Sequence, residues 1–575
     1  MTEINSWPLK WSDAHTGNLE TIQNNSSSVQ LVNREKNGDF RPGTQLWLVF
    51  MTLSLVALMV SLDGSSISVA LPIIAEELNG TGIEAFWSGT SFLLCCTVFQ
   101  PSFGSLSNIF GRRVLMLVAL VFFLLGAIVA SVSNNFQCML IGRSLQGVGG
   151  GGVVALSEII VTDIVPLRLR GQYFGIIGSM ISVGAVTGPL LGGGFSEKVN
   201  WRWIFYINFP FVAIAIVLVI LFFNLNYIPS SLWSKIRRID YIGIFLFVGS
   251  STSFLIPVTW GGVMYPWTSA RTLAPMIIGA VGLILFIFHE KYIAADPMIP
   301  LSIFASRTAV VNYAGTLVHG LTLWCGLYYL PLYFEAVKGY SPVMAGVALF
   351  PDTFSVAPCA ILVGILITYT GHYRWAIWLG WILTTLGMGL LCLLEADTSI
   401  PAWIFLMVIS GLGVGILFPA LVFAIQGSAK PQDVAMAVAM TSFFRSFGET
   451  LGVAIGGSIF QNRMRANLLG YPALAPYADK YSKDAAALVE TIRSMPSGGV
   501  KNDLRVAYTD SLRIVWAVCC AVAGASMFLS LMTKEYDLSP EAVKSDQGSI
   551  NGTAGSEEEE GAEWAEEAEE ALKYV

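Results

Sequence analysis

The segment Ser61-Leu-Asp-Gly-Ser-Ser-Ile-Ser-Val-Ala-Leu-Pro72 places a carboxylate, Asp63, deep inside an apolar run that begins near Leu46. About 17 residues separate the two positions, and at about 1.5 Å per residue this is roughly 25 Å along a spanning helix. A charge at that depth is costly, and such charges face a bundle interior or a water-filled cavity where they have a function. Asp63 is therefore the first candidate functional residue.

The composition around this segment is that of a polytopic membrane protein. Apolar residues make up 54% of the 575 residues and charged residues only 12%, about half of the roughly 25% typical of a soluble domain. Apolar runs of about 18 residues or more recur along the chain, which a large soluble core does not require. The fold class expected is all-α and polytopic, with about fourteen transmembrane helices. The predicted spans lie near residues 46–72, 86–106, 112–133, 137–162, 171–195, 203–224, 240–260, 273–293, 309–335, 343–368, 374–394, 402–426, 434–461 and 512–533.

The basic residues indicate how these spans are oriented, because cytoplasmic loops carry an excess of Lys and Arg. The loops on one side carry most of them: Arg112, Arg113, Arg168, Arg170, Lys235, Arg237, Arg238, Lys291, Arg307, Arg374 and Lys430. We therefore expect both termini to be cytoplasmic and residues 462–511 to form a long extracellular loop. Asn79-Gly-Thr81 then lies outside as an N-glycosylation acceptor, with Asn79 as the modified residue.

Two pairs of motifs indicate an internal repeat. Gly104-Ser-Leu-Ser-Asn-Ile-Phe-Gly111-Arg-Arg113 follows span two, and Gly364-Ile-Leu-Ile-Thr-Tyr-Thr-Gly371-His-Tyr-Arg374 follows span ten. Gln146-Gly-Val-Gly-Gly-Gly-Gly-Val-Val-Ala155 in span four is similar to Ser410-Gly-Leu-Gly-Val-Gly-Ile-Leu-Phe-Pro-Ala420 in span twelve. Spans one to six then repeat as spans nine to fourteen, an arrangement typical of two bundles that rock about a site near the membrane midplane. Chance similarity between glycine-rich helices is the alternative.

This repeat predicts the domain organisation. Residues 1–45 form a disordered cytoplasmic N-terminus, and 46–224 form a six-helix bundle. Residues 225–308 form a linker with two extra transmembrane helices. Residues 309–533 form the second six-helix bundle, and 534–575 form an acidic disordered cytoplasmic tail.

The motifs resemble those of the major facilitator superfamily. The turn with Gly104, Asn108, Gly111, Arg112 and Arg113 resembles the family's loop signature, although an acidic residue usually stands at the position of Asn108. With that charge lost, we expect Arg112 and Arg113 to lack their usual local partner. In the family this loop is thought to latch the cytoplasmic side through charge and helix-dipole contacts. The resemblance therefore implies the turn geometry more strongly than the latch.

Two further motifs carry the resemblance to proton-coupled exporters. Arg143-Ser-Leu-Gln-Gly-Val-Gly-Gly-Gly152, with Gln146 and Gly147, looks like the span-four motif, whose arginine the family links to proton transfer. Gly184-Ala-Val-Thr-Gly-Pro-Leu-Leu-Gly-Gly-Gly194, with Gly188, Pro189 and Gly192, resembles the span-five motif of antiporters. Small residues there allow helices to approach closely, and the proline can bend its helix. Simple glycine-mediated packing is the alternative interpretation.

The resemblance extends to the fourteen-span drug:proton antiporter branch over roughly residues 46–533. It rests on Leu62–Pro72, on Asn200-Trp-Arg-Trp-Ile-Phe-Tyr-Ile-Asn-Phe-Pro210 and on Phe443-Phe-Arg-Ser-Phe-Gly-Glu-Thr-Leu-Gly-Val-Ala-Ile-Gly-Gly457. The segments 351–358 and 373–378 are similar in style to those of filamentous-fungal members. The resemblance implies two six-helix bundles with two inserted central helices.

The buried ionisable residues are the candidate coupling sites. Asp63 lies in the outer third of span one, and Arg143 lies about 9 Å below the outer surface on span four, at similar depth. In the family fold these spans share a bundle, so we predict that the two residues pair or exchange a proton. Arg445 and Glu449 share a face of span thirteen at i and i+4 and are further coupling candidates, or simply a neutralising structural pair. Glu158 and Asp163, near the basic end of span four, are expected to meet water or loop arginines.

Aromatic and polar residues of spans nine and ten are candidates for the substrate cavity. They are His319, Trp324, Tyr328, Asp352 and Phe354. An apolar, aromatic cavity with few polar groups suits mid-sized amphipathic molecules. Packing among helices is the alternative role for each residue.

The sequence therefore predicts a proton-coupled exporter of hydrophobic small molecules that works by alternating access. The cargo would be a fungal toxin, a secondary metabolite or a drug. A siderophore-iron uptake carrier and a non-transporting membrane receptor are the alternatives. No metal-binding His-Glu-x-x-His, phosphate loop or Cys-x-x-Cys motif occurs in the sequence, so we expect neither an enzyme nor a cofactor, and the drive is the proton gradient. We expect a monomer in the lipid bilayer without nucleic-acid partners, in the plasma membrane or in a vacuolar or vesicular membrane.

Overall fold

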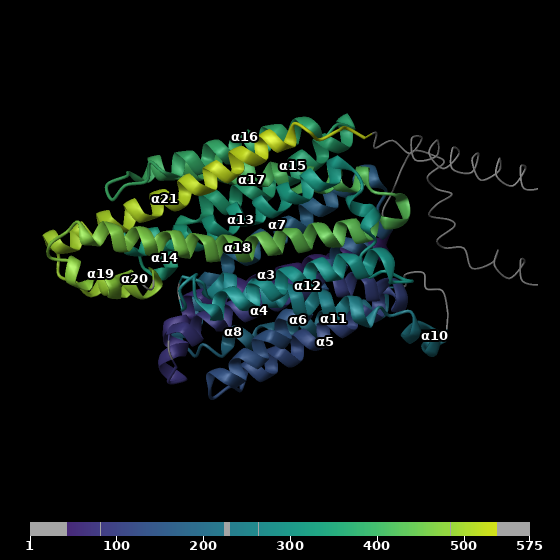
Figure 1. The fold of residues 1–575 in the computed structure, drawn as a ribbon, viewed down its shortest axis with the longest axis horizontal. Coiled ribbons are helices and arrows are strands. Elements are labelled where there is room, and N and C mark those ends of the chain that lie inside the picture. Colours follow the sequence, from purple (N-terminus) through teal and green to yellow (C-terminus); the bar gives the residue numbers. More distant parts are fainter. Residues whose placement is uncertain (1–42, 81, 224–230, 263, 483–484, 537–575) are drawn as a thin grey trace, which may run out of the picture.

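The computed structural model describes residues 43–80, 82–223, 231–262, 264–482 and 485–536. Most of the N-terminal segment 1–45 and of the acidic tail 534–575, both predicted to be disordered, lies outside these residues. Within them the chain is all-α, with no strand, and long helices lie side by side along one axis (Figure 1). The all-α prediction is confirmed.

The long helices fall into the predicted order of two bundles with an inserted pair. The first bundle contains α3 (Thr44–Glu77), α4 (Gly82–Phe110), α5 (Arg112–Ser131), α6 (Phe136–Ile164), α7 (Arg170–Lys198), and α8 (Trp203–Tyr206) followed by α9 (Asn208–Phe222). The inserted pair is α11 (Tyr241–Trp260) and α12 (Ala270–Tyr292). The second bundle contains α13 (Arg307–Ala336), α14 (Pro342–Ala348) followed by α15 (Phe350–Thr370), α16 (Arg374–Leu391), α17 (Ile400–Ser428), α18 (Val434–Leu469) and α21 (Gly499–Ser530). Short connecting helices are η2 (Leu167–Leu169), α10 (Leu232–Arg237), η3 (Leu301–Phe304), η4 (Pro431–Asp433), η5 (Ala475–Tyr477), α19 (Ala478–Tyr481) and α20 (Ala485–Ser494).

Each predicted span coincides with one of these long helices. In the described residues, 11 helices are long and apolar enough to cross a membrane. The other full-length helices, α4, α13 and α18, are less apolar because they carry buried polar side chains such as Gln100, His319 and Arg445. Helices enclosed by other helices need not be apolar all round, so about fourteen spans agrees with this structure.

The two ends of the helical body differ in charge. α5, α7 and α16 begin with Arg112, Arg170 and Arg374 at the same end, which is called the basic end below. The opposite end, called the far end, carries α19 and α20, at the left of Figure 1.

The predicted long loop 462–511 is wrong in its extent. α18 continues to Leu469 and α21 begins at Gly499, so only residues 470–498 connect them, and these contain η5, α19 and α20. The two extensions pack on each other, since Asn467 of α18 donates from Nδ2 to Ser511 Oγ of α21 at 3.1 Å. The outer faces of both extensions carry polar and charged residues, which lower the mean hydropathy of these segments. The apolar inner faces are therefore not recognised from the mean hydropathy.

The internal repeat appears in the two turns at the basic end. Gly111 and Gly371, which close the matching motifs, have φ values of 93° and 72°. Glycine adopts this region readily, whereas a residue with a Cβ is strained there. The first glycine of each motif faces the other bundle: Gly104 on α4 packs against Ala439 of α18, and Gly364 on α15 packs against α7.

The glycine-rich helices α6 and α17 also pack equivalently. Gly147 and Gly151 of α6 touch the backbone of α4, and Gly149 touches the backbone of α5. Their counterparts on α17 are Gly411 and Gly415, which face α15, and Gly413, which faces α16. α6 and α17 therefore each pack between two neighbouring helices at distances that leave no room for a side chain at these glycines.

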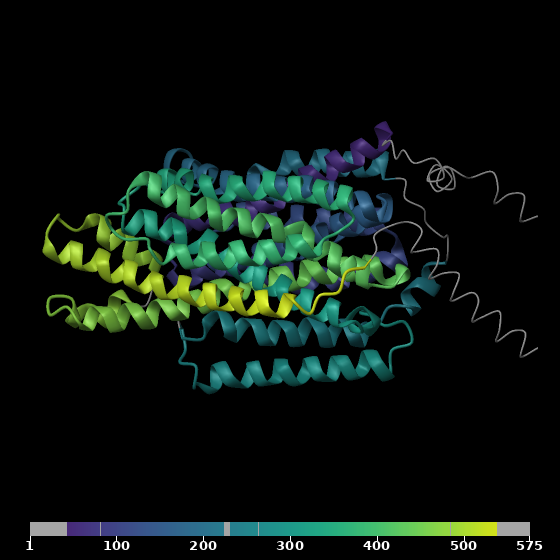
Figure 2. The same ribbon diagram turned by 90° about the horizontal axis from the view of Figure 1, so that it is seen from above.

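The inserted pair lies at the edge of the body (Figure 2). α11 packs on both α4 and α18, which belong to different bundles. Phe247 of α11 contacts Phe443 of α18 with ring centroids 5.2 Å apart. At the far end, Ser458 of α18 donates to the Gly261 carbonyl at 3.2 Å. The inserted helix thus covers the seam between α4 and α18.

The close packing of α6 leads to a testable expectation. A Cβ at Gly151 would collide with the carbonyl of Cys96 on α4, whereas Gly249 on α11 faces open space. Gly151→Ala should lower the free energy of unfolding by about 1–3 kcal/mol because the helices must move apart. Thermal unfolding of the purified protein should show a lower midpoint for Gly151→Ala than for Gly249→Ala. Equal midpoints would contradict the packing described here.

Candidate functional site

The predicted pair of Asp63 and Arg143 is present in the first bundle. Arg143 Nη1 donates to Asp63 Oδ2 at 2.6 Å, and both side chains are fully buried. Gln146, one turn further along α6, donates from Nε2 to Asp63 Oδ1 at 2.7 Å. Gln146 Oε1 in turn accepts a bond from Arg143 Nη1 at 2.8 Å. The spacing of Arg143 and Gln146 on one helix face lets both reach the same carboxylate.

Two further helices complete this site. Asn208 of α9 donates from Nδ2 to Asp63 Oδ1 at 2.7 Å. Arg143 Nε donates to the backbone carbonyl of Ser88 on α4 at 3.0 Å. α3, α4, α6 and α9 therefore converge on one ion pair. We call Asp63, Arg143, Gln146 and Asn208 the carboxylate cluster.

The sequence did not single out Asn208 as a site residue. It is a fully buried amide on α9, a helix that is otherwise almost entirely apolar. A lone amide in an apolar span is the signal that could have found it, because a buried polar group requires a hydrogen-bond partner.

Arg143 is also enclosed by aromatic rings. Its guanidinium carbon lies 4.4 Å from the ring centroid of Phe92 and 5.8 Å from that of Phe205. This cation–π contact offsets part of the cost of burying the guanidinium. Among the described residues, Arg143 Nη2 and Asn208 Oδ1 have no hydrogen-bond partner. The cluster therefore contains one donor and one acceptor without a partner. Each hydrogen bond of the cluster to the Asp63 carboxylate is donated to it.

The antiporter-like motif on α7 packs directly on the helix that carries Asp63. Cβ atoms on Gly188 and Gly192 would collide with the backbone of α3 around Leu62 and Ser66. Ser61 of α3 donates to the carbonyl of Ile181 on α7 at 2.6 Å. Pro189 lies inside α7, where it removes one backbone donor. The motif thus fixes the distance between α7 and the helix of the carboxylate cluster.

The loop motif at the basic end does have partners, so the prediction that Arg112 lacks them is wrong. Arg112 Nη1 donates to Asn108 Oδ1 at 2.6 Å, and its Nε lies 2.8 Å from Asp163 Oδ2. An amide oxygen accepts from arginine without carrying a charge, and α6 supplies the carboxylate that the loop lacks. Arg113 donates to the carbonyl of Ile220 on α9 at 2.5 Å. The expectation that Asp163 meets a loop arginine is confirmed.

The alternative interpretation of Arg445 and Glu449 as a neutralising pair on α18 does not agree with the structure. Arg445 Nη1 instead lies 3.2 Å from Glu158 Oε1 on α6, with both side chains almost fully buried. Glu158 was expected to meet water or loop arginines, and that prediction is also wrong. A helical i, i+4 spacing shows which residues can pair within α18. It does not show which residue of the other bundle binds Arg445 instead. Proton coupling by Arg445 and Glu449 stays a prediction.

The five candidate cavity residues differ in their burial and in their contacts. His319 Nε2 lies 3.1 Å from the carbonyl of Val414 on α17, and this side chain is fully buried. Phe354 is half exposed and contacts Phe350 of its own helix. Asp352 is buried, whereas Trp324 and Tyr328 are partly buried. Their role in binding a substrate stays a prediction.

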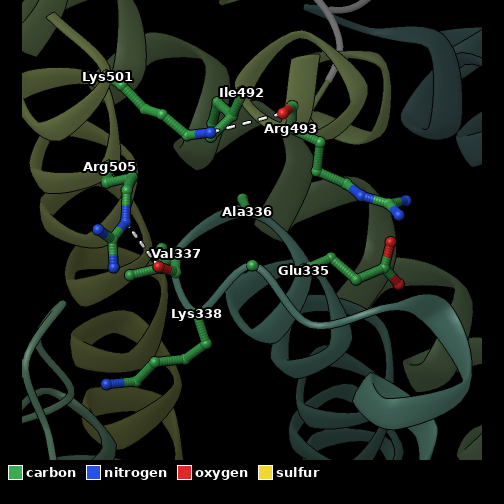
Figure 3. Close-up of a pocket in the computed structure, with 9 residues that line it drawn as sticks. Glu335, Ala336, Val337, Lys338, Ile492, Arg493, Lys501 and Arg505 are labelled. Carbon is green, nitrogen blue, oxygen red and sulfur yellow. Dashed lines mark hydrogen bonds between the residues drawn. The ribbon is translucent and has the colours of Figure 1, made fainter. Parts of the chain in front are cut away.

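A cavity of about 210 Å³ lies at the far end, away from these residues. Basic side chains from α20, α21 and the segment after α13 line it (Figure 3). Lys338 Nζ donates to the carbonyls of Ala396 and Thr398 at 2.7 Å each, and Arg505 Nε donates to the carbonyl of Val337 at 2.7 Å. These cations therefore tie loops of the far end together. Burial lowers the pKa of Lys338.

Comparison with known proteins places the chain among transporters. The family model of the Major Facilitator Superfamily matches residues 53–453. The chain is 55% identical over 499 residues to "MFS transporter L2" of Phoma sp., which covers 87% of this chain and 83% of that protein. It is 36% identical to the "Acurin A biosynthesis cluster MFS-type transporter" of Aspergillus aculeatus, with 89% and 93% covered. It is 35% identical to the "MFS-type efflux pump LUC4" of Fusarium sp., with 87% and 90% covered.

One solved structure shares the fold. The crystal structure of the human organic anion transporter MFSD10 (TETRAN) superposes with a TM-score of 0.52 at 15% sequence identity, covering 83% of this chain and 98% of that chain. At this identity the likeness concerns the fold alone.

The carboxylate cluster makes a clear stability prediction. Arg143→Met removes the cation and leaves a buried carboxylate without it, so the free energy of unfolding should fall by about 3–5 kcal/mol. Adding Asp63→Asn should restore most of this loss, because the second substitution removes the uncompensated charge. Thermal unfolding of Arg143→Met, of Asp63→Asn and of the double variant, compared with the unmodified protein, gives a double-mutant cycle. Additive losses in the double variant would contradict a coupled pair.

Proposed function

The chain belongs to the major facilitator superfamily and is a membrane transporter, and we propose that it is a proton-coupled exporter of hydrophobic or amphipathic small molecules. The observation that carries the proposal is the fully buried pair of Asp63 and Arg143 in the first bundle. A desolvated carboxylate inside a membrane bundle is a candidate proton carrier. The packing of the antiporter-like α7 motif on the same helix supports export rather than uptake.

Asp63 can gain or lose a proton while the other side chains of the carboxylate cluster stay in place. When a proton binds Asp63 Oδ2, the carboxylate loses its charge and its bond from Arg143 weakens. Arg143 still donates to Gln146 Oε1 at 2.8 Å and to the Ser88 carbonyl at 3.0 Å. These neutral acceptors hold the guanidinium in place while Asp63 changes state.

A path of packed helices leads from the cluster to the other bundle. α3 carries Asp63 and packs along α7 through Gly188 and Gly192. α7 in turn packs on α15 of the second bundle, where a Cβ at Gly175 would lie 3.0 Å from the Ile361 Cα. A change in the charge of Asp63 can therefore alter the α3–α7 contact and, through it, the contact between the bundles. This supports alternating access by rocking of the two bundles.

We further propose that the basic end faces the cytoplasm, because cytoplasmic loops carry most of the Lys and Arg. Both chain termini then lie in the cytoplasm, and Asn79 lies outside as a site for N-glycosylation. The plasma membrane is the proposed location, and vacuolar or vesicular membranes would give the same orientation. The protein would act as a monomer driven by the proton gradient, without a cofactor.

The cargo proposed is a fungal secondary metabolite, a toxin or a drug. Support comes from relatives named as an efflux pump and as a transporter of a biosynthesis cluster. The aromatic side chains Trp324, Tyr328 and Phe354 of the second bundle would suit an amphipathic molecule.

The proposal is tested with Asp63→Asn in reconstituted vesicles. A pH gradient should drive rhodamine 6G across vesicles that contain the unmodified protein, and the driven flux should fall about tenfold or more in the variant. Exchange of labelled for unlabelled dye without a gradient should persist, because it does not require a net proton movement. Glu395→Gln, which changes an exposed carboxylate at the far end, is the control for charge loss alone. Full gradient-driven flux through Asp63→Asn would remove Asp63 from the coupling role.

A further inference from the structure

The ion pair of Glu158 and Arg445 crosses the boundary between the two bundles. Glu158 lies on α6 of the first bundle, and Arg445 lies on α18 of the second. Their side chains are 6% and 8% exposed, and the closest atoms are 3.2 Å apart. The neighbouring bond from Gln100 Nε2 to Ser446 Oγ, at 3.0 Å, crosses the same boundary. The two bundles are thus joined here by a buried charge pair.

This pair is held by few other groups. Glu158 Oε2 and Arg445 Nε have no hydrogen-bond partner among the described residues. The guanidinium of Arg445 lies 4.0 Å from the ring centroid of Phe418 on α17, so the arginine is anchored on its own bundle. A buried pair with unfilled hydrogen-bond sites gains less from its environment than a fully bonded one. It is therefore better suited to opening than to permanent closure.

The backbone of Arg445 belongs firmly to the second bundle. Cβ atoms on Gly320 and Gly448 would collide with the facing backbones of α18 and α13, respectively, because the two helices touch there. α18 therefore has to move with α13. If the bundles part at the basic end, Arg445 moves with the second bundle and Glu158 with the first, so their bond has to break.

Glu449 lies one helical turn from Arg445 on the same helix. The spacing i, i+4 brings such side chains within reach of each other. Among the described residues, Glu449 has no ion pair within 4.0 Å in the present arrangement. α18 therefore carries a carboxylate that is near the arginine but does not bind it while Glu158 does.

We propose that Arg445 exchanges partners during transport, binding Glu158 when the basic end is closed and Glu449 when the bundles have parted. Loss of one partner from a buried pair is strongly unfavourable, and a second carboxylate on the same helix offsets that loss. Glu158 then faces the opened side, where water solvates it. The exchange lets the bundles separate without leaving a bare cation between them.

The proposal rests on the alternating movement of the proposed function but not on proton coupling at Asp63. The two can therefore fail separately. Exchange of labelled for unlabelled rhodamine 6G without a pH gradient needs the movement only. Glu449→Gln should lose this exchange about tenfold or more, because the opened state lacks a partner for Arg445, whereas the far-end variant Glu395→Gln should retain it.

Hydrogen–deuterium exchange of the full chain in nanodiscs distinguishes the two carboxylates. Glu158→Gln should speed exchange about tenfold at the basic-end halves of α7 and α15, because the closed state loses its cross-bundle pair. Glu449→Gln should slow exchange in the same segments, because it removes the partner of the opened state. Glu395→Gln is the matched control, since its pair with Arg513, at 3.4 Å, lies within the second bundle at the far end.

Opposite shifts for Glu158→Gln and Glu449→Gln support the partner exchange. Shifts in the same direction, or no shift for Glu158→Gln, would overturn it. If Glu158→Gln does not fold, Glu449→Gln decides alone, because Glu449 holds no ion pair in the closed arrangement and its loss should leave the thermal midpoint unchanged. Unchanged dye exchange together with unchanged deuterium uptake in Glu449→Gln would also overturn the proposal.

Discussion

The cost of a charge away from water is the constraint on which the first bundle depends. Asp63 and Arg143 are both fully buried, and each is stable there because the other lies 2.6 Å away. The pair alone does not suffice, since desolvated charges need their remaining hydrogen-bond sites filled as well. α4, α6 and α9 supply these bonds except at Arg143 Nη2, which has no partner among the described residues, so the positions of four helices follow from one carboxylate.

Close helix packing gives this charge a link to the rest of the molecule. The α7 motif has no side chains where it meets α3, and α6 has none where it meets α4 and α5. Helices that touch through their backbones move together, because there is no flexible side chain between them to absorb a shift. The same arrangement recurs in the second bundle between α13 and α18. Backbone contacts therefore tie helices together within each bundle, and α7 and α15 also touch through their backbones across the boundary between the bundles.

The sequence predicted the fold and the central pair because both depend on strong local patterns. Apolar runs define spans, basic loops define their order across the membrane, and depth along two spans brings Asp63 level with Arg143. Asn208 escaped notice because an amide in an apolar helix carries no charge to mark it. Glu158 and Arg445 escaped because the sequence shows partners along one helix but not across two bundles. The extended ends of α18 and α21 were missed because polar outer faces mask their buried inner faces.

Infrared difference spectroscopy on the purified protein, recorded between alkaline and acidic pH, tests the central claim most directly. It detects the C=O stretch of a carboxyl group that gains a proton inside the protein, and it requires no knowledge of the cargo. The account predicts a buried carboxyl band that is lost in Asp63→Asn and retained in Asp163→Asn. A band that persists unchanged in Asp63→Asn would contradict the account, because the proton would then bind elsewhere.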